Sequence, residues 1–164
     1  MDILDISLIF SILTCSLVTG FIFTYAVVVM PGLSKLNDQE FIRAFQVTDG
    51  IIQNNQPLFM LTWLGSIIAI LSSIIISIVF VGISETWLII LVGVVYLLGV
   101  QGITISIHIP LNNHLQQVNI DELNAQKLSE ERIKFEKKWN NFNIIRTVIA
   151  FSVSAILLLI ITVR

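Results

Sequence analysis

The chain has 164 residues, of which 55% are hydrophobic and 12% are charged, whereas about a quarter of the residues in a soluble domain are charged. Together with a mean hydropathy of +0.91, this shortage of charge indicates an integral membrane protein, because a bilayer excludes charged side chains. The net charge of −2 excludes a nucleic-acid partner, which would require a clustered basic surface.

Four apolar stretches are long enough to cross a hydrocarbon core of about 30 Å at 1.5 Å per residue. The first is followed by Pro31 and the third by Pro110, and we expect both to end there, because proline interrupts helical hydrogen bonding. The pattern predicts an all-α, four-transmembrane-helix antiparallel bundle in contact with the lipid bilayer, and a single membrane domain over residues 1–164. The predicted spans cover residues 6–30, 57–83, 87–109 and 144–163.

Each of the two long loops between these spans contains a predicted short helix. Residues 38–56 place Phe41, Ile42 and Phe45 on one side, as in an amphipathic helix that lies against the membrane. Residues 121–139 form a charged helix that leads into the fourth span.

Lysine and arginine residues gather in the same two loops. Lys35 and Arg43 precede the second span and a basic segment precedes the fourth, whereas the opposite side of the bundle has only Arg164. The positive-inside rule therefore places both long loops in the cytoplasm and both termini outside it. The membrane we expect is a bacterial inner membrane.

Small residues recur at every fourth position in three spans, which lets helix backbones approach closely in lipid. Packing within the bundle explains these stripes better than a dimer interface, because four helices must contact each other in any case; homo-oligomerisation stays open. The stripes contain Gly65, Ala69, Ser73 and Ser77 in the second span, Ser16, Gly20 and Thr24 in the first, and Ala150 and Ser154 in the fourth.

Polar side chains gather at the predicted cytoplasmic ends of the spans. Gln101, Thr104 and His108 share one face of the third span, because they are offset by three and seven residues. Polar groups at membrane depth must pair with each other or face a wet cavity. We therefore predict a pocket that opens toward the cytoplasm, with the candidate residues Asp49, Asn54, Gln101, Thr104, His108, Asn112, Asn143 and Arg146.

Simpler interpretations of these residues remain. Arg146 extending to a lipid phosphate, Gln101 bridging two helices and His108 as a satisfied interfacial histidine each explain one residue without a pocket. The tryptophans at the span ends fit an aromatic belt at the membrane surface; they are Trp63, Trp87 and Trp139.

The sequence offers few ligands for a metal or a prosthetic group. His108 and His114 lie in one short segment, so a bis-histidine haem would lack ligands from two facing helices. Asp49 with His108 would form only a weak metal site. The lone Cys15 has no C-x-x-C partner, and no Gly-rich phosphate loop is present. We predict no metal and no cofactor.

Several short motifs occur in order along almost the whole chain: Gly20-Phe21, Val29-Met30-Pro31-Gly32-Leu33, Gln46, Pro57-Leu58-Phe59, Thr104 with Pro110-Leu111-Asn112, and Asn143-Ile144-Ile145-Arg146-Thr147. Together they resemble the anthrone-oxygenase-like membrane family. The resemblance implies a four-helix membrane bundle. For the characterised members it also implies oxidation of an anthrone by O₂ to an anthraquinone without metal or flavin.

The chain departs from the family pattern at three positions, since Asp49 and His108 stand where relatives tend to carry Asn, and Phe142 replaces a Trp. In the mechanism that the resemblance suggests, His108 is the base and Asp49 orients it. Asn112, Asn143 and Arg146 stabilise the substrate anion, and the apolar volume between the helices holds a small, flat aromatic molecule. The alternative is a non-catalytic membrane protein that binds a lipid, a quinone or a partner subunit.

Overall fold

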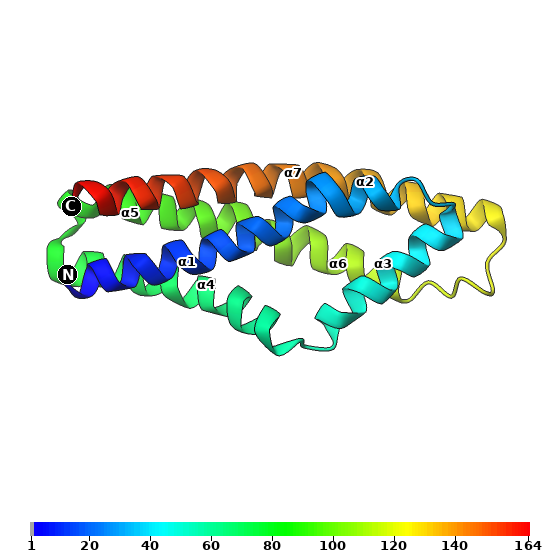
Figure 1. Cartoon of the computed structure of the whole chain (residues 1–164), viewed down its shortest axis with the longest axis horizontal. Coiled ribbons are helices and arrows are strands. Elements are labelled where there is room, and N and C mark those ends of the chain that lie inside the picture. Colours follow the sequence, from blue (N-terminus) through cyan, green and yellow to red (C-terminus); the bar gives the residue numbers. More distant parts are fainter. Residues whose placement is uncertain (1) are drawn as a thin grey trace.

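The computed structural model describes residues 2–164, which are helical apart from short connections (Figure 1). Four continuous helices are long and apolar enough to cross a membrane: Ile3–Leu33, Pro57–Val81, Ile83–Gln116 and Ala125–Val163. We call them the first to fourth spanning helices. The chain is therefore an integral membrane protein with four candidate transmembrane helices. The first, third and fourth extend beyond the predicted spans, whereas the second, Pro57–Val81, starts at the predicted residue and ends two residues earlier than predicted.

The first spanning helix comprises α1 (Ile3–Thr24), a π-helical turn (Tyr25–Val29) and α2 (Met30–Leu33). The predicted stop at Pro31 is wrong, because this proline lies in the first turn of α2, where its missing N–H breaks no bond. Helix α3 (Asp38–Gln53) follows.

Helix α3 does not turn its predicted apolar side to the membrane. Phe41, Ile42 and Phe45 are fully buried, and Phe45 packs edge-on against Phe135 of the fourth spanning helix at 4.6 Å between ring centroids. The aromatic side chains of the fourth spanning helix cover this side of α3, so it is buried within the protein and not against lipid.

The second spanning helix joins α4 (Pro57–Ile76) to a π-helical turn (Ser77–Val81). A tight turn at Gly82, whose φ of 108° suits glycine, leads into the third. The third spanning helix contains α5 (Ile83–Tyr96) and two π-helical segments (Leu97–Gly102 and Thr104–His108). It continues through α6 (Ile109–Gln116). Pro110 does not end it, contrary to our prediction, because Pro110 occupies the first turn of α6.

The fourth spanning helix is the single helix α7 (Ala125–Val163). The helix predicted from residue 121 begins at Ala125, after an Asn124 side chain that accepts from the backbone N–H of Lys127. It passes from charged to apolar sequence without a break. Charge-bearing and membrane-spanning parts are thus one rigid element.

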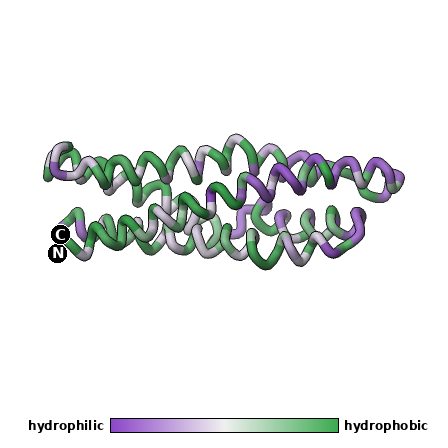
Figure 2. Tube along the Cα trace, turned by 90° about the horizontal axis from the view of Figure 1, so that it is seen from above, coloured by the Kyte–Doolittle hydropathy of each residue, from purple (hydrophilic) through white to green (hydrophobic). Residues whose placement is uncertain are grey.

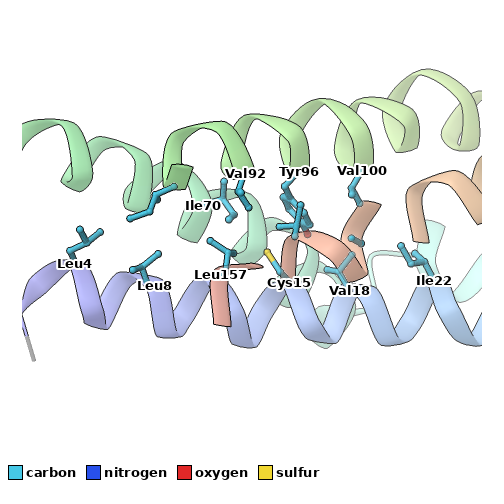
Figure 3. Packing of buried hydrophobic residues seen from close by; sticks show 13 residues of the cluster. Leu4, Leu8, Cys15, Val18, Ile22, Ile70, Val92, Tyr96, Val100 and Leu157 are labelled. Carbon is cyan, nitrogen blue, oxygen red and sulfur yellow. The ribbon is translucent and has the colours of Figure 1, made fainter. Parts of the chain in front are cut away.

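Two buried apolar clusters hold the helices together. The first lies in the half of the bundle that contains both termini, and Figure 3 shows Leu4, Leu8 and Cys15 of α1 facing Ile70, Val92 and Tyr96. The second, centred on Phe45, Phe135 and Trp139, lies at the other end. Hydrophilic residues concentrate at that second end, whereas hydrophobic residues predominate around the termini (Figure 2).

The small-residue stripes differ in whether they pack inside the bundle. Ser73 of α4 shares hydrogen bonds with Ser7 (2.7 Å) and Ser11 (3.0 Å) of α1, and Ala150 is fully buried. The stripe of the first span is exposed instead, and a Cβ added to Gly20 would meet no atom within 4 Å. For Ser16, Gly20 and Thr24 the prediction of internal packing is therefore wrong.

Candidate functional site

A cavity of about 500 Å³ lies between the spanning helices in the half of the bundle away from the termini. Its apolar wall comes from the first spanning helix and the start of α4, where Phe21 and Phe59 meet edge to face at 5.1 Å. Its polar wall comes from α3, the third spanning helix and α7. The polar lining residues include Asp49, Gln53, Asn55, Thr104, His108, Asn112 and Arg146.

His108 lies on this polar wall at the end of a π-helical segment, with a side chain that is only 2% exposed. Its ring meets Trp139 edge to face at 4.9 Å between centroids. Both ring nitrogens are buried without a hydrogen-bond partner. The predicted Asp49–His108 pair is therefore wrong. Buried polar atoms are almost always bonded, so this imidazole needs an explanation.

Arg146 is the second unusual group, since its guanidinium is buried and no carboxylate pairs with it anywhere in residues 2–164. Its Nε donates to Asn143 Oδ1 at 2.9 Å and its Nη1 donates to Thr104 Oγ1 at 3.0 Å. The guanidinium carbon lies 5.6 Å from the centroid of the Trp139 ring. A buried cation held only by neutral groups is suited to receive an anion.

Asn143 does not line the cavity but stands behind Arg146. It is fully buried, and its amide nitrogen donates to the backbone carbonyl of Ile22 at 3.1 Å. Because its oxygen accepts from Arg146, Asn143 ties the guanidinium to the first spanning helix. The structure thus places it as a support for Arg146 and not in contact with the cavity.

Asp49 is the centre of an amide network. Its carboxylate accepts from Gln53 at 2.8 Å, from Asn112 at 2.7 Å and from Gln116 at 3.2 Å. The oxygen of Asn112 in turn accepts from the indole N–H of Trp139 at 2.9 Å. Helices α3, α6 and α7 are joined through these bonds.

The family model for anthrone oxygenase matches residues 57–156, which are 100 of the 164 residues of the chain. The chain belongs to the anthrone oxygenase family. The matched segment runs from the start of α4 into α7 and contains Thr104, His108, Asn112 and Arg146. No curated protein and no solved structure matches the chain.

Gln101 of this anthrone oxygenase family member is buried outside the cavity wall. Its oxygen accepts from Trp63 Nε1 at 2.6 Å, and its amide nitrogen donates to Tyr96 Oη at 3.0 Å and to Ser66 Oγ at 3.3 Å. Gln101 therefore bridges the second and third spanning helices, as the simpler interpretation proposed. The aromatic-belt interpretation stays a prediction for the exposed Trp87, whereas Trp63 and Trp139 are hydrogen-bonded inside the bundle.

Asn54 also lies outside the cavity, because it caps the end of α3 with an exposed side chain. Its neighbours Gln53 and Asn55 line the wall instead. Sequence reasoning also missed Trp139, although a signal existed. Trp139, Asn143 and Arg146 are spaced by four and three residues, which places them on one face of α7.

Among residues 2–164, no three His, Cys, Asp or Glu side chains come together to form a metal site. The weak site considered for Asp49 with His108 would therefore lack a third ligand of this kind.

Proposed function

We propose that this protein binds a small, flat aromatic molecule in the cavity and oxidises an anthrone-like substrate with O₂, without a metal or an organic cofactor. The observation that carries the proposal is the buried, unbonded imidazole of His108 on the polar wall of the cavity. Family membership supports the same chemistry. The geometry supports His108 as base and Arg146 as the main anion-binding group.

The cavity has the size and character for such a molecule. Ligand pockets of about 300–1,000 Å³ hold drug-sized molecules, and this one measures about 500 Å³. Phe21, Tyr25 and Phe59 present aromatic rings to it. Such side chains bind a planar ring system by stacking and edge contacts.

The first chemical step is removal of a proton from the benzylic CH₂ of the substrate by a nitrogen of His108. Protein atoms cover both nitrogens, so the proposed step requires the ring to rotate toward the substrate. Rotation costs little, because no well-formed hydrogen bond holds either nitrogen. Negative charge then develops on the substrate carbonyl oxygen, where Arg146 Nη2 and the second N–H of Asn112 can donate to it.

The carbanion adds O₂, and the resulting peroxide anion takes back the proton held by His108. Loss of the second benzylic proton to the imidazole, with cleavage of the O–O bond, forms the new carbonyl and expels hydroxide, which leaves as water. One anthrone and one O₂ thus yield one anthraquinone and one water. The two electrons that reduce the second oxygen atom come from the substrate carbon.

The membrane setting of this proposal is a single membrane domain over residues 1–164 with an antiparallel arrangement of the spans. The lysines and arginines of the loops support a cytoplasmic position for α3 and the start of α7, with both termini outside and a bacterial inner membrane as the location. Thr104 lies about 30 Å along its helix from Ile83. The polar wall of the cavity then falls near the cytoplasmic border of the hydrocarbon core.

A second candidate function is non-catalytic binding of a lipid, a quinone or a partner subunit. Its support is the combination of a buried cation without a carboxylate and an apolar wall that reaches Leu17 and Val18, deep in the first spanning helix. A phosphate or a quinone oxygen would suit Arg146 equally well.

The deciding experiment is O₂ uptake by the purified protein with anthrone, compared between the wild type and His108→Gln, which keeps the size and polarity of the side chain. We expect one O₂ consumed per anthrone and a fall in kcat of about a hundredfold for the variant, as is typical for loss of a general base. Unchanged uptake in His108→Gln would refute the assignment of the base. If wild-type protein has no activity but co-purifies with a phospholipid or quinone, the second function is correct.

A further inference from the structure

Asp49 is buried beside the proposed site, yet it contacts neither the proposed base nor the proposed anion-binding group. Its side chain is 3% exposed, and its carboxylate oxygens are occupied by the side-chain amides of Gln53, Asn112 and Gln116. No lysine, arginine or histidine in residues 2–164 forms an ion pair with it. A buried carboxylate whose hydrogen-bond donors are all side-chain amides requires a role other than pairing with a cation.

The chemistry of its partners determines how Asn112 is oriented. A carboxylate can only accept hydrogen bonds and an indole N–H can only donate one. Asn112 therefore must direct its NH₂ group to Asp49 and its oxygen to Trp139, as observed at 2.7 Å and 2.9 Å. The opposite orientation of the amide would break both bonds. In this way the carboxylate of Asp49 determines that the oxygen of Asn112 faces the indole N–H of Trp139 and accepts from it.

Trp139 is the side chain that contacts both proposed reactive groups, His108 and Arg146. His108 meets its ring edge to face at 4.9 Å with an interplanar angle of 83°, and the guanidinium carbon of Arg146 lies 5.6 Å from its centroid. His108 has no hydrogen bond of its own to fix the position of its ring. Any rotation of the indole would therefore remove the ring that the imidazole packs against and would change the aromatic contact of the guanidinium.

We propose that Asp49 is a positioning residue, which orients Asn112 and through it holds Trp139 as the support for His108 and Arg146. The assigned purpose of this chain of contacts rests on the proposed function, but the contacts themselves are testable without any substrate. Asp49 then acts across three helices, from α3 through α6 to α7. It needs no proton exchange to do so.

The test exchanges the carboxylate and the side-chain amide between positions 49 and 112. Asp49→Asn alone presents an NH₂ group to donors that need an acceptor and frees Asn112 to turn. Asp49→Asn combined with Asn112→Asp places the carboxylate at position 112, where it can accept from both the amide at position 49 and Trp139. The matched control is Asp121→Asn, the same chemical change at an exposed carboxylate.

The first readout is the indole N–H resonance of Trp139 in ¹⁵N-tryptophan-labelled protein in detergent micelles. The chain has three tryptophans, and Trp139→Phe identifies the resonance. We expect Asp49→Asn to shift or broaden it, the exchanged pair to restore it, and the Trp87 resonance to stay in place throughout. An unmoved Trp139 resonance in Asp49→Asn would overturn the proposal. If that single variant does not fold, the exchanged pair decides: a wild-type resonance supports the proposal and a displaced one overturns it.

The second readout is O₂ uptake with anthrone, which we expect to fall about tenfold in kcat for Asp49→Asn, with a smaller change in KM, and to stay unchanged in the control Asp121→Asn. A tenfold change corresponds to about one misplaced hydrogen bond. Wild-type protein that fails to oxidise anthrone contradicts the proposed function alone, because the resonance still reports on Asp49. Resonance shifts with unchanged uptake contradict the positioning role alone.

Discussion

Replacing Arg146 with methionine should abolish anion binding while leaving the stability of the fold nearly unchanged. The guanidinium makes two charged hydrogen bonds and one contact with an aromatic ring, worth roughly 4–7 kcal/mol together. Burying the charge costs several kcal/mol, which offsets this gain. The oxygen of Asn143 is left without its donor, at about 1–3 kcal/mol. We expect the free energy of unfolding to fall by less than about 1.5 kcal/mol.

Arg132 of the same helix provides the matched comparison, because protein acceptors bond to all three nitrogens of its guanidinium. It donates to Asp38 and Glu136 and to the backbone carbonyls of Ser34 and Leu36. It also stacks on Phe41 at 4.5 Å. Arg132→Met removes all of these contacts and should lower the free energy of unfolding by about 3 kcal/mol.

The assay is reversible unfolding of each variant in mixed micelles at increasing SDS concentration, followed by helical circular dichroism. A loss for Arg146→Met as large as that for Arg132→Met would refute the reasoning. Arg146 would then be a structural anchor, and its lack of a carboxylate would say nothing about a ligand.

Two further predictions concern the packing that holds the cavity walls in place, both measured in the same unfolding assay. Gly93→Ala should lower the free energy of unfolding by about 1 kcal/mol, because the added Cβ would lie 2.8 Å from Ile74 Cδ1. Gly20→Ala should be neutral or slightly stabilising, because the added Cβ would meet no atom within 4 Å. Equal effects of the two substitutions would contradict this prediction. Tyr96→Phe should lower stability by about 1–2 kcal/mol, since Tyr96 Oη donates to Ser66 and accepts from Gln101. An unaffected variant would mean that Gln101 and Ser66 satisfy each other.

The spans could be predicted because apolar length is a direct physical requirement of the bilayer. The ends at Pro31 and Pro110 could not, since each of these prolines follows a π-helical turn and occupies the first turn of the next α-helical segment. A π-helical turn changes the hydrogen-bond register and leaves no mark in hydropathy. The helices consequently run beyond the apolar sequence and carry polar residues into the site.

Five of the eight candidate residues line the cavity, namely Asp49, Thr104, His108, Asn112 and Arg146. Helical spacing identified a shared face for Gln101, Thr104 and His108, but it does not report depth. Gln101 lies between two packed helices, where Trp63 is its donor. The partners of a buried amide come from other helices, and a single sequence does not specify which.

The groups proposed to touch the substrate and the group proposed to order them come from different parts of the chain. His108 and Arg146 lie within the segment that matches the anthrone oxygenase model, whereas Asp49 on α3 precedes it. An asparagine at position 49, as the resemblance leads us to expect in relatives, offers one acceptor oxygen where the carboxylate offers two. The Asn112 amide would then be free to turn. The carboxylate of Asp49 therefore restricts the position of Trp139, and with it the placement of His108, more tightly than an amide at the same position can.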